Sequence, residues 1–373
     1  MRTRSQHAQA TRSEAPLARA PTKQQGGTVP SSVPSEGEDV GSHFLEVTEE
    51  EFSKFVDDAA THAGITAVAL TALSARRSAK RTFDALAVVP DLRDLRLGCF
   101  QSSAALKTAA PRLATLTALQ ALELPGGALT ADVAAALSKH LPGMPCLRHL
   151  TLRAVKLTNE HVRLLAKLTA ITRLSVLNSP LVDGALPKLL LGTACMPALQ
   201  RLDLDGSSIN GNKGAVSAAP SQHTHLSLRG MVGDGFFDWA IGLLLLPSSP
   251  ALRSLDISSH GAVDSDDDPV DDTVLSCLMA CDLHSLDVSD GSTAAGGSLA
   301  LVVESLRSLT SLDVSRTPIP NLKELTGCLA KLPALKRVVA AELPGVSSKQ
   351  VAAARKALQK VPDVTITAGA AAA

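Results

Sequence analysis

Charged side chains recur beside leucines at fixed places in this chain, and charge is the chemistry that its sequence offers most clearly. The acids Asp203, Asp256, Asp287 and Asp313 each follow a leucine, and the bases Arg173 and Arg201 each precede one. If these segments form neighbouring strands, about 4.8 Å apart, like side chains line up in columns. Such columns predict a surface that orients a charged protein partner. In a second interpretation, repeat duplication copied the pairs and they serve only solubility.

A run of acids occupies residues 264–272. Its members are Asp264, Asp266, Asp267, Asp268, Asp271 and Asp272. Clustered carboxylates can bind Ca²⁺ or Mg²⁺, but this run lacks the glycine and the distal glutamate of an EF-hand loop. The last two acids also suit the first turn of a helix, where the dipole favours negative charge. We interpret the run as a solvated loop, with contact to a basic partner as the alternative, and predict no metal site.

Enzyme chemistry has little support in the sequence. No phosphate-binding loop, nucleophile elbow or zinc-binding H-E-x-x-H motif occurs. The six cysteines are scattered without a C-x-x-C pair, which indicates buried reduced thiols rather than metal ligands. We therefore predict a protein that is not an enzyme, with no catalytic residues and no cofactor.

Composition excludes further classes of function. Lys+Arg and Asp+Glu both number 36, which argues against a general binder of nucleic acid or of anionic membranes. Aromatic residues make up 2% of the chain and tyrosine is absent, so stacking on bases would be hard to build. No apolar run has the length of a membrane span, and no secretory signal is evident. We expect a cytoplasmic protein with neither nucleic acid nor membrane as a partner.

The elements that must position the charged columns come from a repeat, Leu-x-x-Leu-x-Leu. Its apolar and polar residues alternate, as in a strand with one buried face. A fixed period of this kind indicates one structural unit copied many times, with a large curved surface. The clearest copies are Leu92-Leu95-Leu97, Leu119-Leu122-Leu124, Leu147-Leu150-Leu152, Ile171-Leu174-Val176, Leu199-Leu202-Leu204, Leu252-Leu255-Ile257, Leu283-Leu286-Val288 and Leu309-Leu312-Val314.

Between these strands the sequence has helical periodicity. Thr130 and Thr158 are suitable N-caps for the apolar faces that follow them. Near the end of the chain, Ser347 and Gln350 have the spacing of a capping box. Each unit is therefore predicted to be strand, turn, helix, turn.

Over residues 65–368 this pattern resembles the leucine-rich repeat family, of the ribonuclease-inhibitor-like type. The resemblance implies an α/β solenoid, a horseshoe with a parallel sheet on its concave side and helices on its convex side. Family members usually carry Asn or Cys eight residues after the first leucine. The chain has other residues there, so no continuous asparagine ladder is possible. They are Phe100, Gly127, Val155, Ser179, Ser207, Met231, His260, Gly291, Thr317 and Leu343.

The ends of the chain have a different character. Residues 1–42 are poor in large apolar side chains and are expected to form a disordered arm. Their arginine-rich, acid-poor composition leaves a mitochondrial targeting peptide as the alternative. Residues 43–64 are predicted to form a capping helix over the open end of the solenoid, with Thr48 and Glu51 as its capping box. Residues 369–373 are expected to be a short disordered tail.

One aromatic cluster is a weaker candidate for partner binding on the convex side. Phe236, Phe237 and Trp239 follow a polar stretch, residues 209–222, that is predicted to be a loop. The rings fill the gap beside that loop, or one of the two phenylalanines stays exposed and binds a partner, as large aromatics often do at interfaces.

Together these features predict a non-catalytic protein-binding scaffold that uses the concave face of the solenoid. Some GTPase-activating proteins share this fold, so a regulatory role of that kind is one alternative that the resemblance implies. A structural subunit of a large assembly, for example in mitochondria, is another. The sequence does not name the partner.

Overall fold

The computed structural model describes the greater part of the repeat region. The chain divides into residues 1–41 and residues 42–373, and all described residues belong to the second part. The described residues are 45–48, 65–72, 79–89, 91–98, 102–182, 189, 193, 195–210, 222–233, 250–259, 278–279, 281–291 and 295–369.

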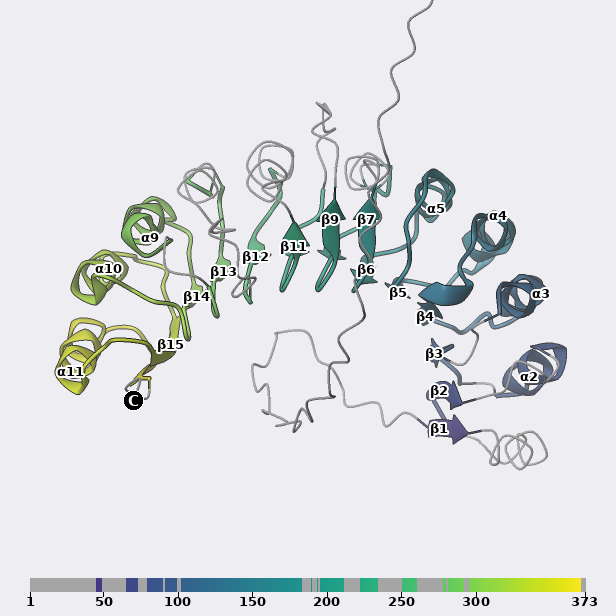
Figure 1. The fold of residues 1–373 in the computed structure, drawn as a ribbon, viewed down its shortest axis with the longest axis horizontal. Helices are drawn as coiled ribbons and strands as arrows, with labels where there is room; N and C mark the ends of the chain where they lie inside the picture. Colours follow the sequence, from purple (N-terminus) through teal and green to yellow (C-terminus); the bar gives the residue numbers. More distant parts are fainter. Residues whose placement is uncertain are drawn as a thin grey trace, which may run out of the picture. The chain divides into compact units, whose positions relative to one another are not determined.

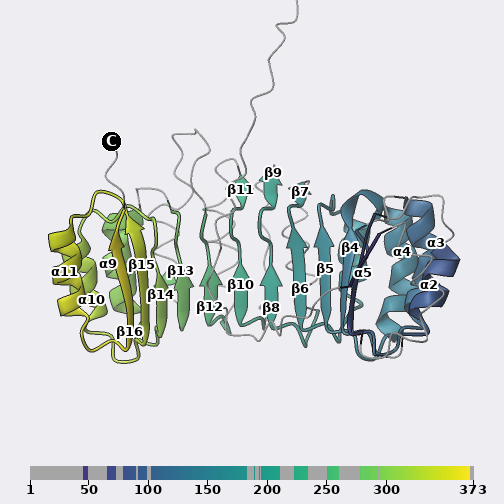
Figure 2. The ribbon, with the colours of Figure 1, turned by 90° about the horizontal axis from the view of Figure 1, so that it is seen from below.

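A parallel sheet of 13 strands lines the inner side of the arc that the described residues form (Figure 1). Its strands follow one another in chain order, as Figure 2 shows. They are β1 (Leu45–Thr48), β2 (Ala67–Ala72), β3 (Asp94–Arg96), β4 (Ala121–Pro125), β5 (His149–Arg153), β6 (Arg173–Leu177), β8 (Arg201–Asp203), β10 (His225–Ser227), β12 (Ser254–Asp256), β13 (Ser285–Asp287), β14 (Ser311–Asp313), β15 (Arg337–Leu343) and β16 (Asp363–Ala368).

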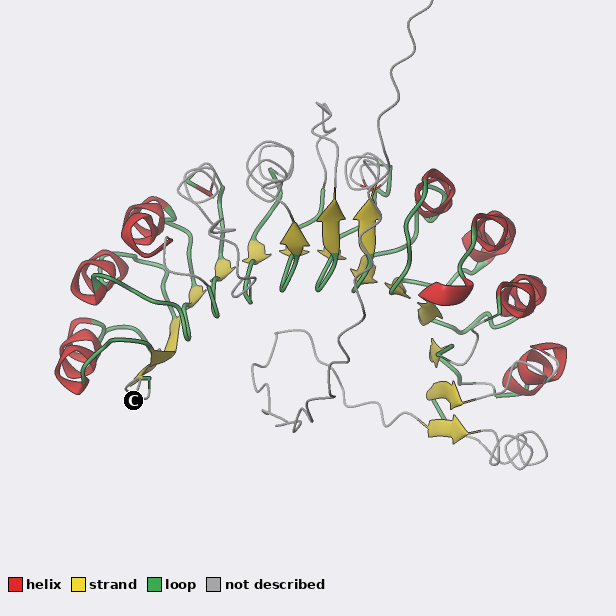
Figure 3. Cartoon of the chain, viewed as in Figure 1, coloured by secondary structure: helices red, strands yellow, loops and turns green. Residues whose placement is uncertain are grey.

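Helices cover the outer side of the same arc (Figure 3). They are α2 (Ala79–Leu86), α3 (Ser103–Leu113), α4 (Ala131–His140), α5 (Asn159–Leu165), α9 (Ala295–Ser305), α10 (Leu322–Leu329) and α11 (Ser348–Ala357), with short 3₁₀ helices η2 (Gly126–Ala128) and η3 (Leu141–Gly143). An open parallel sheet inside and helices outside make an α/β leucine-rich repeat solenoid, so the predicted fold class is confirmed.

The predicted caps lie at the starts of their helices, but the Thr130 side chain makes no capping hydrogen bond. Thr130 precedes α4 and Thr158 precedes α5, and Ser347 forms the predicted capping box with Gln350 at the start of α11. At α5 the third residue of the helix is His161, whose Nδ1 accepts the backbone N–H of Thr158 at 3.1 Å. Its Nε2 lies 2.8 Å from the carbonyl oxygen of Leu129 in the preceding repeat. This buried imidazole therefore caps one helix and ties two repeats together.

The leucines of the repeat form one continuous core between sheet and helices. The central leucine of each strand pairs in register with the next, as Leu174, Leu202 and Leu226 do. Leu202 is 0% exposed, as are Leu174 and Leu312. Burying a leucine side chain contributes about 1.5–3 kcal/mol. Stacked leucines thus fix which residues of each strand face outward, because a slip by one residue would turn them all over.

The first predicted element is partly wrong. Residues 45–48, assigned to a capping helix, form strand β1, which pairs in parallel with β2. Leu45 and Val47 alternate with polar residues, and Val47 is 2% exposed, so this segment has the period of a strand. The remaining residues of the predicted helix, 43–44 and 49–64, lie outside the described residues.

A second, smaller sheet interrupts the predicted loop. It joins β7 (Pro180–Val182), β9 (Ser208–Asn210) and β11 (Val232–Gly233), all in parallel. Residues 209 and 210 were predicted to be loop but belong to strand β9. Ile209 pairs there with Leu181, whose side chain is 1% exposed. The rest of that loop, 211–221, lies outside the described residues.

Hydroxyl groups replace the family's asparagine in parts of the turn. Ser179 Oγ accepts the N–H of Val155 at 3.0 Å, and Ser207 Oγ accepts the N–H of Ser179 at 3.1 Å. Further on, Thr317 Oγ1 accepts the N–H of Gly291 at 3.3 Å. These hydroxyl groups accept hydrogen bonds from buried backbone N–H groups without forming a continuous ladder. A buried N–H without such a partner would cost free energy.

Candidate partner-binding face

Two columns of charged and polar residues cross the concave face, and the strand register places them as predicted. The first column includes Arg173 and Arg201, paired as neighbours on β6 and β8. The second runs through Asp256, Asp287 and Asp313 on β12, β13 and β14. The six predicted site residues therefore form two groups, which we call the arginine clamp and the aspartate ladder.

The arginine clamp is built around Asp203. Its Oδ2 accepts Arg173 Nε at 3.0 Å and Ser175 Oγ at 2.8 Å, and its Oδ1 accepts Arg201 Nε at 2.9 Å. The Asp203 side chain is 3% exposed, whereas those of Arg173 and Arg201 are 45% and 36% exposed. Asp203 thus holds the two guanidinium groups in place, and the arginines are the part of the clamp that a partner can reach.

Two histidines flank the clamp in the same column. His149 lies beside Arg173 on β5, and His225 lies beside Arg201 on β10. Burial first, and then the charge of Arg173, lowers the pKa of His149. Burial and then Arg201 lower the pKa of His225 in the same way. Burial is the main reason why the imidazoles stay neutral, the arginines add to it, and at His225 the charge of Asp203 acts in the opposite direction.

The aspartate ladder carries three carboxylates on adjacent strands. In each one, Oδ1 accepts a backbone N–H two residues further on, at 2.9 Å for Asp256 and Asp287 and 2.8 Å for Asp313. Among the described residues, no lysine, arginine or histidine forms an ion pair with any of the three. The turns fix these carboxylates in position without a direct ion pair, although the charge of Arg316 acts on Asp313 from a greater distance.

Crowding of like charges shows most at the middle carboxylate. Burial raises the pKa of Asp287 to about 6, with the charge of Asp256 as the next cause and that of Asp313 a smaller one. At neutral pH the Asp287 carboxylate is therefore ionised in the folded chain, which lowers the stability of the fold. Groups perturbed in this way concentrate at functional sites, although structural networks also perturb them.

Small polar side chains lie beside the aspartate ladder on the concave face. Ser254, Ser285 and Ser311 pair in register on β12, β13 and β14, directly next to the column of carboxylates. Small side chains here leave the carboxylates accessible from the concave side, where a chain running across the strands would meet them in succession.

A further carboxylate, which the sequence analysis did not select, lies between the two groups. Asp205 accepts Ser227 Oγ at 2.5 Å and the backbone N–H of Arg229 at 3.2 Å. Burial raises its pKa, the bond from Ser227 lowers it, and the charges of Asp203 and Asp256 raise it further. The repeated Leu-Asp pair at Leu204 was the signal for it in the sequence.

Other candidates lie elsewhere. Phe236, Phe237 and Trp239 and the acidic run 264–272 lie outside the described residues. Within the described part of the chain, no three acidic, histidine or cysteine side chains converge to hold a metal ion. The helices described also include none with the length and apolar character needed to cross a membrane.

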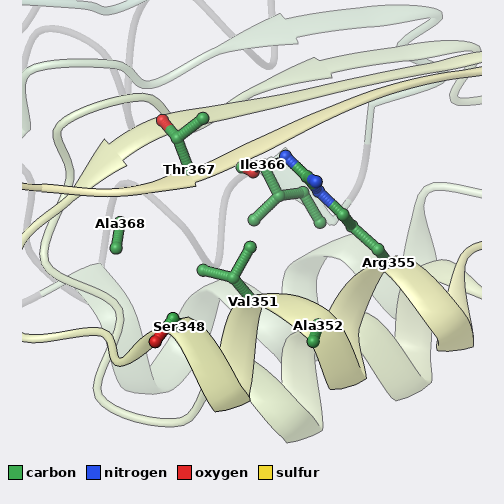
Figure 4. A pocket seen from close by; sticks show the side chains of 7 residues that line it. All are labelled: Ser348, Val351, Ala352, Arg355, Ile366, Thr367 and Ala368. Carbon is green, nitrogen blue, oxygen red and sulfur yellow. Dashed lines mark hydrogen bonds between the residues drawn. The ribbon is translucent and has the colours of Figure 1, made fainter.

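A shallow pocket lies where the solenoid ends, between α11 and β16 (Figure 4). Its residues are Ser348, Val351, Ala352, Arg355, Ile366, Thr367 and Ala368. Arg355 reaches across it and donates from Nη2 to the carbonyl oxygen of Ile366 at 2.6 Å. Its contact ties the last helix to the last strand, so the pocket belongs to the end of the fold rather than to the charged face.

Comparisons with known proteins add little beyond these features. No protein-family model matches the chain, and no curated protein matches it. Among solved structures, an internalin (inlF) of Listeria monocytogenes is 16% identical, with 76% of this chain and 83% of that chain covered and a TM-score of 0.39. TLR13 in complex with ssRNA13 is 16% identical, with 82% and 46% covered and a TM-score of 0.42.

The mouse RP105/MD-1 complex is likewise 16% identical, with 82% of this chain and 51% of that chain covered and a TM-score of 0.45. This chain thus spans about half the length of two of the three structures. At such values the assignment of the leucine-rich repeat fold rests on the strands and repeats of the chain itself.

Proposed function

We propose that this chain is a non-catalytic protein-binding scaffold and that its concave face binds the partner. The observation that carries the proposal is the aspartate ladder, three carboxylates fixed by their own turns on adjacent strands and without a described ion-pair partner. A row that only served solubility would not need to keep Asp287 ionised against burial and two like charges.

Site-specific photo-crosslinking tests which face is used. Ser285 on β13 is replaced by benzoylphenylalanine, and Lys323 on the outer helix α10 is replaced in a matched variant. Both proteins are expressed in the cells of origin and irradiated. We expect a discrete adduct from position 285 and none from position 323. Adducts of equal yield from both positions, or from position 323 alone, contradict the proposal.

The cytoplasmic location and the ribonuclease-inhibitor-like subtype stay predictions. Amino-terminal sequencing of the native protein tests the location, because cleavage within residues 1–42 would favour the mitochondrial alternative. A GTP hydrolysis assay with the crosslinked partner tests whether the scaffold also activates a GTPase.

A further inference from the structure

We propose that the arginine clamp binds a phosphate monoester on the partner, and that the aspartate ladder binds basic residues of the same segment. The ligand is therefore a phosphorylated, basic peptide segment that runs across the strands. This inference rests on the proposed function, since it names the kind of partner that the concave face would bind.

The first argument is the geometry of the two arginines. Both use Nε to bond Asp203, and neither makes a hydrogen bond through its terminal nitrogens to another described residue. Two pre-positioned guanidinium groups on adjacent strands therefore offer their terminal N–H groups side by side. Arginine binds phosphate and carboxylate through such parallel donors.

The second argument is the charge and number of acceptors. One guanidinium group already satisfies both oxygens of a carboxylate. Two adjacent groups suit a ligand with three strong acceptor oxygens and a charge near −2, which a phosphoserine or phosphothreonine carries at neutral pH. His149 and His225 on either side supply additional donors in the same column.

The third argument is what surrounds the clamp. Asp205 lies two residues beyond Asp203 in the chain, and the aspartate ladder begins at Asp256, two strands along the sheet from Arg201. An extended polyanion such as RNA would be repelled by these carboxylates, and the described concave columns include no phenylalanine, tyrosine or tryptophan on which bases could stack. A peptide with one phosphate group followed by basic residues matches this order of arginines and then carboxylates along the sheet.

Strand spacing sets the spacing of the charges on the ligand. A phosphate between Arg173 and Arg201 lies about 2.5, 3.5 and 4.5 strand spacings from the three ladder carboxylates, roughly 12, 17 and 22 Å at about 4.8 Å per strand. An extended peptide rises about 3.3 Å per residue. The basic residues are therefore expected about four to seven positions from the phosphorylated residue.

Synthetic peptides test this by fluorescence anisotropy with the full chain. One peptide carries phosphoserine with lysines four, five and seven positions after it, and a second has the reverse order. Controls lack the phosphate or carry alanines in place of the lysines. We expect one order to bind, with at least tenfold weaker binding when either the phosphate or the lysines are absent.

Protein variants then locate the phosphate. Removing the arginines outright would leave Asp203 buried and unpaired, so Arg173→Lys and Arg201→Lys are combined, which keeps the charge and loses the paired donors. This variant should bind the phosphopeptide at least fivefold more weakly and leave the melting temperature near that of the parent. The matched pair Arg112→Lys and Arg163→Lys, on the outer helices, should change nothing.

Equal binding of phosphorylated and unphosphorylated peptides, or no effect of the clamp variant, overturns the inference. So does a single-stranded RNA that binds more tightly than either phosphopeptide. Phosphatase treatment of the cells' extract before irradiation separates the two proposals. An adduct at position 285 that survives the treatment keeps the scaffold and contradicts the phosphate, whereas no adduct with or without treatment contradicts the scaffold itself.

Discussion

Asp287→Asn tests whether the aspartate ladder costs the fold stability. Asparagine keeps an oxygen to accept the backbone N–H of Ser289, which Asp287 Oδ1 now accepts at 2.9 Å. It removes the charge that burial and Asp256 disfavour. The pKa of Asp287 is raised from 3.8 to about 6, and each unit corresponds to about 1.4 kcal/mol. Allowing for its partial exposure, we expect the variant to be more stable by roughly 1–3 kcal/mol at pH 7.5.

The sign of the pH dependence follows from the direction of the shift. Because the folded pKa lies above the unfolded one, the stability that the protonated carboxyl contributes is full below pH 3.8 and is lost as pH rises through about 6. The advantage of the variant should therefore be small at pH 4 and grow toward pH 7.

Urea unfolding followed by circular dichroism at pH 4, 5, 6 and 7.5 measures this difference. Asp91→Asn, at an exposed position, is the matched control and should stay within about 0.5 kcal/mol of the parent at every pH. A neutral or destabilising effect of Asp287→Asn at pH 7.5, or one that is equal at pH 4, would refute the reasoning.

Three further perturbations address the framework. Leu202→Ala should lower the free energy of unfolding by about 2–5 kcal/mol, whereas Leu301→Ala, at a side chain 60% exposed, should change it little; equal effects would refute the register. Ser207→Ala should cost about 1–3 kcal/mol, because its hydroxyl accepts a buried N–H at 3.1 Å; a neutral result would mean that water replaces it. Burial lowers the pKa of His161, so protonation below about pH 6.5 should destabilise the wild type, and His161→Gln should flatten that loss between pH 7.5 and 5; an unchanged pH profile would contradict this.

The strand register could be predicted from the sequence because the pattern has a period of two and repeats many times. Every central leucine that the sequence assigned to the core, from Leu95 to Leu312, is buried, and the outward columns followed from that. Strand β1 was missed because Leu45 and Val47 alone give too short an alternation to compete with a capping-box pattern at Thr48 and Glu51.

The turn after each strand could not be predicted in the same way. Residues of many types have positive φ there, including Asn178, Gly206, Asp290 and Arg316. Glycine adopts this conformation readily, and asparagine and aspartate do so more often than other residue types. Bonds between neighbouring repeats, such as Arg316 N–H to the carbonyl oxygen of Ala341 at 2.8 Å, hold the other residue types in place.

The arginine clamp was predicted only in part. The sequence placed Arg173 and Arg201 in one column and Asp203 in the next, as three separate partner-binding residues. It could not show that Asp203 bonds both arginines, because side-chain direction across two strands depends on packing rather than on spacing. The structure therefore gives Asp203 a positioning role, while the arginines keep their predicted place on the accessible face.

Charge reversal at the aspartate ladder tests the central claim most directly. Asp256→Lys and Asp287→Lys are combined, and the affinity for the partner crosslinked at position 285 is measured at several salt concentrations. The account predicts at least tenfold weaker binding, a smaller dependence of affinity on salt, and an unchanged circular dichroism spectrum. Unchanged affinity with an intact fold would contradict it and would return the ladder to a role in solubility.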